Sequence, residues 1–170
     1  LRQRGTAAHN TVVVDGLDSS EVWGGFRVAR RAYPVGLHVQ HTDGATSTVV
    51  RCAHNGYTRL PGRPMHQRTW RLDAHGLMVT DQLEGPHRSA EARFHFHPAL
   101  QVRMGTDPFT GTAVLPGGDT VTWQIDRGQA RLEPCTWHPR FGHAQPNVCL
   151  VVQLQGGTSA VHFHWSSSVA

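Results

Sequence analysis

Histidine is the residue type whose number and spacing first suggest chemistry in this sequence. Thirteen of the 170 residues are histidine, and two pairs have the spacing His-x-His, namely His95 with His97 and His162 with His164. Alternate side chains of a β-strand share a face, so each pair would offer two imidazoles to one zinc, copper or iron ion. A metal site needs at least a third ligand, and no carboxylate at a suitable spacing follows either pair. We therefore favour structural roles on a polar sheet face, and whether these side chains face a cleft stays open.

A fifth histidine, His9, stands immediately before Asn10 and the β-branched run Thr11–Val14. The turn dipeptide Asp15-Gly16 closes that run, which is the pattern of a short strand followed by a tight turn. A single histidine near the start of a chain is usually a solvated side chain. We expect Asn10 to be a residue that starts the strand and takes no part in chemistry.

Other reactive groups give weaker signals. Cys52, Cys135 and Cys149 form no Cys-x-x-Cys pair, and their odd number argues against a complete disulfide framework, although one disulfide of unassigned pairing stays open. Cys52 and Cys149 lie in strand-like segments, where we expect small buried hydrophobic residues. Tyr33 and Tyr57 are the only tyrosines; either can act as an acid or base, but packing is the commoner role. The sequence contains no Gly-x-Ser-x-Gly nucleophile motif.

The elements that would hold these residues are predicted to be strands throughout. Apolar alternation and turn signals recur about every 8 to 14 residues, which is typical of an all-β sandwich or barrel. The predicted strands lie at 11–14, 26–31, 35–42, 46–53, 67–72, 77–84, 89–97, 112–115, 120–126, 130–138, 147–155 and 160–167. A turn at Asp73–Gly76 and a hairpin across Pro116–Asp119 (Pro-Gly-Gly-Asp) connect two pairs of these strands. The apolar run Val148–Val152 predicts a central position in its sheet. We interpret residues 1–170 as one domain, an antiparallel β-sandwich of stacked sheets.

Composition excludes several classes of protein. The formal net charge is +4, and all sixteen basic residues are arginine, spread along the chain without a nucleic-acid-binding motif, so we expect no nucleic-acid partner. A mild positive field would favour an anionic ligand. No apolar run approaches the ~18 residues of a membrane span, and because no apolar segment follows the polar residues LRQRGT, we expect no signal peptide within this chain.

The order of short motifs resembles a known family. The segments RGTAAHNTVVVDG, SSEVWGGFRVARRA, HNGYTRL, HQRTWRL, LMVTDQLEG, FHFHP and RFG follow one another from residue 4 to about residue 154. This series resembles the C-terminal β-sandwich of the heparinase II/III-like polysaccharide lyases, a group that includes oligoalginate lyases. The resemblance implies that an N-terminal α/α toroid and the first strands of the sandwich precede Leu1, so that the chain is an N-terminally truncated piece.

The resemblance also implies a function for the parent protein. Such enzymes cleave uronic-acid-containing glycans by β-elimination in a cleft between toroid and sandwich, and they are periplasmic or secreted. Their acid and base, Tyr and His, would lie in the missing part, so no catalytic residue is assigned here and we expect the chain alone to be inactive. His9 matches the third ligand of a structural zinc in metal-binding members. Because the other two ligands would precede Leu1, we expect weak or no zinc binding by this chain.

Two other functions stay open. A non-catalytic carbohydrate-binding sandwich would use the faces of some of the five tryptophans, Trp23, Trp70, Trp123, Trp137 and Trp165, although Trp70 and Trp123 lie in alternating strands that favour core packing. A small metal-dependent, cupin-like enzyme built on the His-x-His pairs is the third and weakest hypothesis. This hypothesis requires that the chain binds a metal ion without any upstream sequence.

Overall fold

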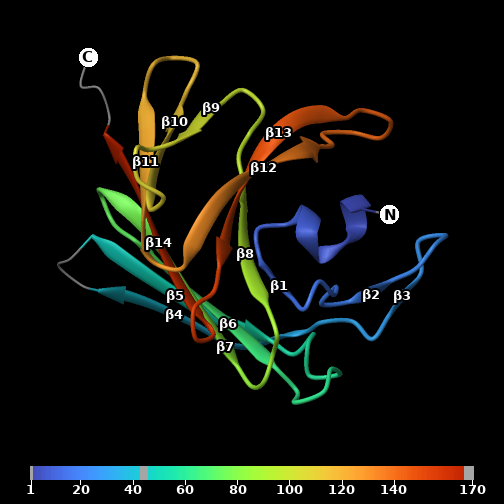
Figure 1. Cartoon of the computed structure of the whole chain (residues 1–170). Helices are drawn as coiled ribbons and strands as arrows, with labels where there is room; N and C mark the ends of the chain where they lie inside the picture. Colours follow the sequence, from blue (N-terminus) through green and yellow to red (C-terminus); the bar gives the residue numbers. More distant parts are fainter. Residues whose placement is uncertain (1, 43–45, 167–170) are drawn as a thin grey trace.

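Two antiparallel sheets stacked face to face make up most of the molecule (Figure 1). The computed structural model describes every residue except Leu1, 43–45 and 167–170. The smaller sheet has the strand order β1-β8-β13-β12, and the larger has the order β4-β5-β6-β7-β14-β11-β10-β9. The predicted all-β antiparallel sandwich is confirmed. Two 3₁₀ turns, η1 (Arg2–Arg4) and η2 (Thr6–Ala8), precede the first strand, and no helix in the described residues is long and apolar enough to span a membrane.

The strands have the following bounds. They are β1 Val12–Val14, β2 Glu21–Val22, β3 Val28–Ala29, β4 Pro34–Thr42, β5 Ser47–His54, β6 Met65–Leu72, β7 Gly76–Glu84, β8 Ala90–His95, β9 Gln101–Met104, β10 Thr110–Val114, β11 Thr120–Arg127, β12 Gln129–Trp137, β13 Gln145–Gln153 and β14 Thr158–Ser166. Strands β2 and β3 form a separate hairpin of two residues on each side, which extends from the sandwich beside η1 and η2 (Figure 1).

The core lies between the two sheets and follows from alternation along the strands. In β13, Leu150 and Val152 point into it, and Trp123 of β11 and Val161 of β14 meet them from the larger sheet. Strand β13 is paired on both sides, with β8 and β12, which confirms its predicted central position. Its opposite face carries Cys149 and Val151, which form a second, smaller buried cluster with Cys135.

Turn residues close the hairpins where the sequence places them. Asp73 accepts hydrogen bonds from the backbone of His75 and Gly76 and so connects β6 to β7, as the motif predicts. The predicted Pro-Gly-Gly-Asp hairpin joins β10 and β11.

The structure differs from the sequence predictions at three places, although the predicted strand 35–42 itself is confirmed as β4. Residues 26–31 do not form one strand, because Phe26 and Arg30 both have positive φ angles and leave only the short hairpin β2–β3. The alternation in β4 does not bury a face: the strand is an edge of the larger sheet with an irregularity after Val35, and Leu37 stays 69% exposed. Strand β9 was not predicted at all.

Candidate functional site

The segment that carries His9 is fixed to the sandwich by a set of hydrogen bonds. The backbone N–H of Thr6 donates to Asp18 Oδ1 at 2.6 Å, and the N–H of Ser19 donates to Thr6 Oγ1 at 2.7 Å. Arg59, from the connection between β5 and β6, donates to the carbonyl oxygens of Asp18 and Ser19. His9 itself ends η2, its N–H donating to the carbonyl of Thr6 at 3.1 Å. The position of His9 is therefore determined by tertiary contacts.

His9 lies exposed at a pocket of about 300 Å³, which we call the N-terminal pocket. Its walls are mostly polar: Arg4, Thr6, His9, Thr11, Ser19, Ser20 and Val22. Hydroxyl, imidazole and guanidinium groups on one concave surface are the groups that hydrogen-bond a sugar or an anion.

Arg4, which lines this pocket, also contacts the β2–β3 hairpin. Arg4 donates to the carbonyl oxygens of Trp23 and Arg27 at 3.1 and 3.5 Å, and its guanidinium lies 5.3 Å from the ring centroid of Phe26. Arg27 in turn lies 5.9 Å from the ring of Trp23. Among the described residues no carboxylate forms an ion pair with either arginine. The hairpin next to Arg4 therefore presents the Arg27 guanidinium and two exposed aromatic rings, since Trp23 is 51% and Phe26 83% exposed.

The described residues do not by themselves fit a zinc ion at His9. His9 belongs to no group of three or more His, Cys, Asp or Glu side chains whose ligand atoms converge within the described part of the chain. One imidazole holds zinc only with further ligands. The three side chains whose ligand atoms do converge in the described part of the chain are His95, Cys135 and Cys149, and His9 is not among them.

The two His-x-His pairs have different surroundings. His95 ends β8, where its N–H donates to Asn10 Oδ1 at 2.8 Å and its Nε2 donates to the carbonyl of Ala7 at 3.1 Å. His97 follows the strand, and its ring packs 4.9 Å from that of Trp137. His162 and His164 share a face of β14, with ring centroids 3.8 Å apart.

Asn10 joins the N-terminal segment to both sheets. Its side chain accepts the hydrogen bond from His95, and its carbonyl accepts one from Arg68 Nη1 at 2.7 Å. It borders a second cavity of about 260 Å³ between the sheets, lined mainly by aromatic and aliphatic side chains, including Trp70 and Phe94.

A buried charged network, which sequence reasoning missed, lies behind this cavity. Arg68 of β6 and Asp81 of β7 are cross-strand partners, and the Arg68 guanidinium contacts the carboxylate through Nε at 2.7 Å and Nη2 at 2.9 Å. His66 donates from Nε2 to Asp81 at 2.7 Å, and its Nδ1 lies 3.1 Å from Nε2 of His54. The polar residues His66, Arg68 and Asp81 at alternate positions of two neighbouring strands were the available sequence signal.

The pKa values show how this network is charged. Burial alone would raise the pKa of Asp81, but the hydrogen bond from His66 and the charge of Arg68 hold it below its usual value. Burial, with the neighbouring His66 and Arg68, lowers the pKa of His54 to about 4. The network therefore holds a carboxylate with a buried guanidinium and keeps His54 neutral at pH 7. Because Asp81 is fully buried, we assign the network to the fold.

The remaining candidates also have structural positions. Burial raises the pKa of Tyr57 to about 12, and its hydroxyl donates to the carbonyl of Val12 at 2.8 Å, so it holds β1 in place and is not an acid or base. Tyr33 is 60% exposed. No disulfide joins the cysteines; Cys135 and Cys149 are buried, whereas Cys52 is only half-buried, contrary to expectation.

Comparison with known proteins gives matches to one family. The family model described as "Heparinase II/III-like, C-terminal" matches residues 2–166. Among solved structures, the chain is similar to the heparan sulfate lyase HepC from Pedobacter heparinus (TM-score 0.72, 15% identity, 98% of this chain and 25% of that one). It is also similar to a heparinase III gene product (0.70, 11%, 96% and 24%) and to a heparinase III crystal structure (0.64, 12%, 95% and 24%). No curated protein sequence matches the chain. The chain thus spans about a quarter of the length of these solved relatives.

Proposed function

Because the chain belongs to the heparinase II/III-like family and carries its C-terminal domain, we propose that it is the sandwich part of a lyase that cleaves uronic-acid-containing polysaccharides by β-elimination. The N-terminal pocket would form part of the wall that contacts the glycan. The heparan sulfate lyase and heparinase III names of the structural neighbours support an acidic polysaccharide as substrate. One observation carries the proposal: the guanidinium of Arg4 lines that pocket and has no carboxylate partner among the described residues.

The chemistry of β-elimination explains why a positive wall would be useful. The base removes the proton on C5, next to the uronate carboxylate, and that proton is only weakly acidic until the carboxylate charge is offset. Electrostatic stabilisation of the enolate-like species is therefore the largest demand on the site. An arginine bound only to carbonyl oxygens and an aromatic ring retains its charge for such a carboxylate.

The catalytic acid and base of the proposed lyase are assigned to a part of the protein outside this chain. We propose that an N-terminal toroid of the same protein supplies the acid and base, packs against this sandwich as its partner, and completes the cleft. A zinc at His9 would take its other ligands from the part of the protein that the resemblance places before Leu1, because the described residues do not provide them. A polysaccharide substrate also implies a periplasmic or secreted enzyme.

The test uses the natural protein that contains this chain. It is incubated with heparin, heparan sulfate and alginate, and unsaturated uronate is followed by its ultraviolet absorbance. We expect product from at least one of these glycans and, for Arg4→Ala, a KM increased by about tenfold or more, the value of one charge-assisted hydrogen bond. Arg103→Ala, an exposed arginine on β9, is the matched control. No product from any acidic glycan, or equal effects of the two substitutions, would contradict the proposal.

A non-catalytic carbohydrate-binding module is the second candidate. It is favoured by three exposed tryptophans, Trp23, Trp137 and Trp165, whose faces can stack on sugar rings. Glycan binding that is lost in Trp23→Ala, in a natural protein that releases no unsaturated product, would favour this candidate over the lyase.

A further inference from the structure

Three potential metal ligands converge on the face of the smaller sheet that points away from the core. His95 ends β8, Cys149 lies in β13 and Cys135 lies in β12, three strands that are hydrogen-bonded neighbours. One ligand atom from each lies within 4.8 Å of the other two. We propose that these residues, which we call the His-Cys-Cys cluster, bind a thiophilic metal ion of the zinc class. The cluster is separate from the N-terminal pocket and does not depend on the function proposed above.

The strand register favours a metal over a disulfide. His95 is directly opposite Cys149, but Cys135 is opposite Asn147, which places the two cysteines on a diagonal. Diagonal cross-strand residues are roughly 7–8 Å apart at Cα, beyond the about 4.4–6.8 Å that a disulfide spans without strain. Two thiolates on a tetrahedral zinc with Zn–S bonds of about 2.3 Å are roughly 3.8 Å apart. Small side-chain movements would therefore bring the sulfur atoms to ligand distance.

The hydrogen bond of His95 to Ala7 determines which ring nitrogen would bind a metal. Its Nε2 lies 3.1 Å from the carbonyl oxygen of Ala7, and because a carbonyl only accepts, Nε2 must carry the hydrogen. In a neutral ring the lone pair is then on Nδ1, which is the atom that would bind the metal. A ligating histidine whose other N–H donates to a backbone carbonyl is the usual arrangement around zinc.

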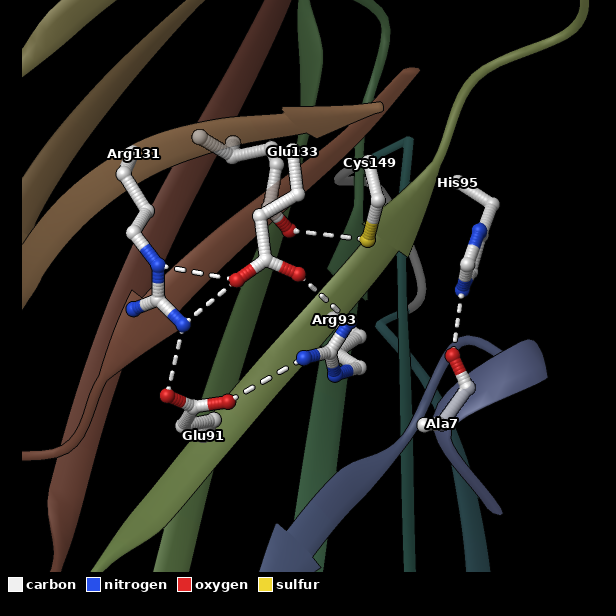
Figure 2. A network of polar contacts seen from close by, with 8 residues as sticks. Ala7, Glu91, Arg93, His95, Arg131, Glu133 and Cys149 are labelled. Carbon is white, nitrogen blue, oxygen red and sulfur yellow. Dashed lines mark hydrogen bonds and ion pairs between the residues drawn. The ribbon is translucent and has the colours of Figure 1, made fainter. Parts of the chain in front are cut away.

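Charge and burial are consistent with the same ion. Cys149 is fully buried and Cys135 is 7% exposed, and two thiolates with a neutral imidazole balance a dication. The nearby carboxylates are occupied: Glu91 and Glu133 form ion pairs with Arg93 and Arg131 at 2.6–3.2 Å (Figure 2). In the same view His95 reaches to Ala7 on the N-terminal segment, while Cys149 lies beside the ion-pair network. Soft thiolate ligands then select zinc or a similar metal over magnesium or calcium.

A fourth ligand has limited room. A cavity of about 10 Å³ adjoins the cluster, between His95, Cys135 and the N-terminal residues Ala7 and Ala8. This is about the space that one water molecule needs, so the fourth position is assigned to a water molecule. Since His95 also holds Ala7, the metal would fix the N-terminal segment, which includes His9, against the sheet. The weak or absent zinc binding expected from the sequence concerned His9 alone. The His-Cys-Cys cluster predicts metal binding by this chain through other ligands.

Titration of the reduced, metal-free chain with Co²⁺, followed by competition with Zn²⁺, tests this inference. Cobalt bound to thiolates gives charge-transfer absorption in the near ultraviolet together with visible bands of tetrahedral geometry. We expect one equivalent to bind, displaced by zinc, and affinity at least tenfold weaker in Cys135→Ser and in His95→Gln. Cys52→Ser and His97→Gln are the matched controls, a thiol and an imidazole outside the cluster, and should bind as the unmodified chain does.

One further variant distinguishes the loss of a metal ligand from the loss of the folded structure. His95→Cys replaces the imidazole by a third thiolate, so it should retain binding and increase the charge-transfer absorption by about half. Absence of thiolate absorption in the folded chain, unchanged affinity in Cys135→Ser, or a Cys135–Cys149 disulfide found by mass spectrometry would overturn the inference. Binding that is lost in His9→Ala but not in Cys135→Ser would also overturn it. Failure of the lyase assay would leave it unaffected.

Discussion

Asp81→Asn is the substitution that most directly tests how the interior of this sandwich is held together. Asp81 is fully buried, and its carboxylate accepts two hydrogen bonds from Arg68 and one from His66. The asparagine has nearly the same shape but no charge, and its amide nitrogen cannot accept a hydrogen bond. The guanidinium of Arg68, only 4% exposed, would then be a buried charge without its partner.

The expected cost follows from that uncompensated charge. Removing one member of a buried ion pair costs about 3–5 kcal/mol, a large part of the 5–15 kcal/mol that is the usual order of stability for a domain. The dependence on pH gives a second check. Because the pKa of Asp81 is lowered in the folded state, its stabilisation is present above the unfolded pKa and is lost as the pH falls through the folded one. The difference in the free energy of unfolding between the unmodified protein and Asp81→Asn should therefore become smaller as the pH falls.

Urea unfolding at pH 7, followed by tryptophan fluorescence and circular dichroism, measures the effect. Asp126→Asn, on an exposed position of β11, is the control and should change stability by less than about 0.5 kcal/mol. The double variant Arg68→Met with Asp81→Leu removes both charges and should be no less stable than Asp81→Asn alone. A loss below about 1 kcal/mol in Asp81→Asn would refute the reasoning, as would a double variant clearly less stable than the single one.

Three further predictions concern the fold. Because the pKa of His54 is lowered to about 4 from 6.5, the unfolded state binds a proton at this histidine more readily than the folded state does. Its contribution to stability is therefore constant above pH 6.5, and up to about 3 kcal/mol is lost as the pH falls from 6.5 toward 4; His54→Gln should flatten this part of the urea stability profile. Gly111→Ala would place a Cβ 2.0 Å from the ring of Trp123 and should lower the melting temperature by several degrees, whereas Gly117→Ala, which meets no atom within 4 Å, should not. Tyr57→Phe removes a buried hydroxyl donor to β1 and should cost about 1–2 kcal/mol in urea; an unchanged midpoint would show that this bond contributes nothing.

Much of the architecture could be predicted because its signals are local. Alternation of apolar residues and turn dipeptides depend on neighbours in sequence, so Asp73–Gly76 and the β10–β11 hairpin were predicted at the observed positions. The continuous apolar run of β13 indicated a strand that is paired on both sides. Strand β4 shows the limit of this reasoning, because the same alternation on an edge strand buries nothing.

The composition of the sites, in contrast, was decided mostly by the tertiary structure. The residue types and order of the chain determined the fold class and the family, and they singled out His9, which does line a pocket. Only the tertiary structure decided which polar groups meet: Arg68 with Asp81 across two strands, and His95 with two cysteines that are 40 and 54 positions away in sequence. The physical reason is that strand periodicity fixes the face on which a side chain lies, whereas the partners across the sheet depend on strand order and register. Those are set by the packing of the whole core and not by neighbouring residues.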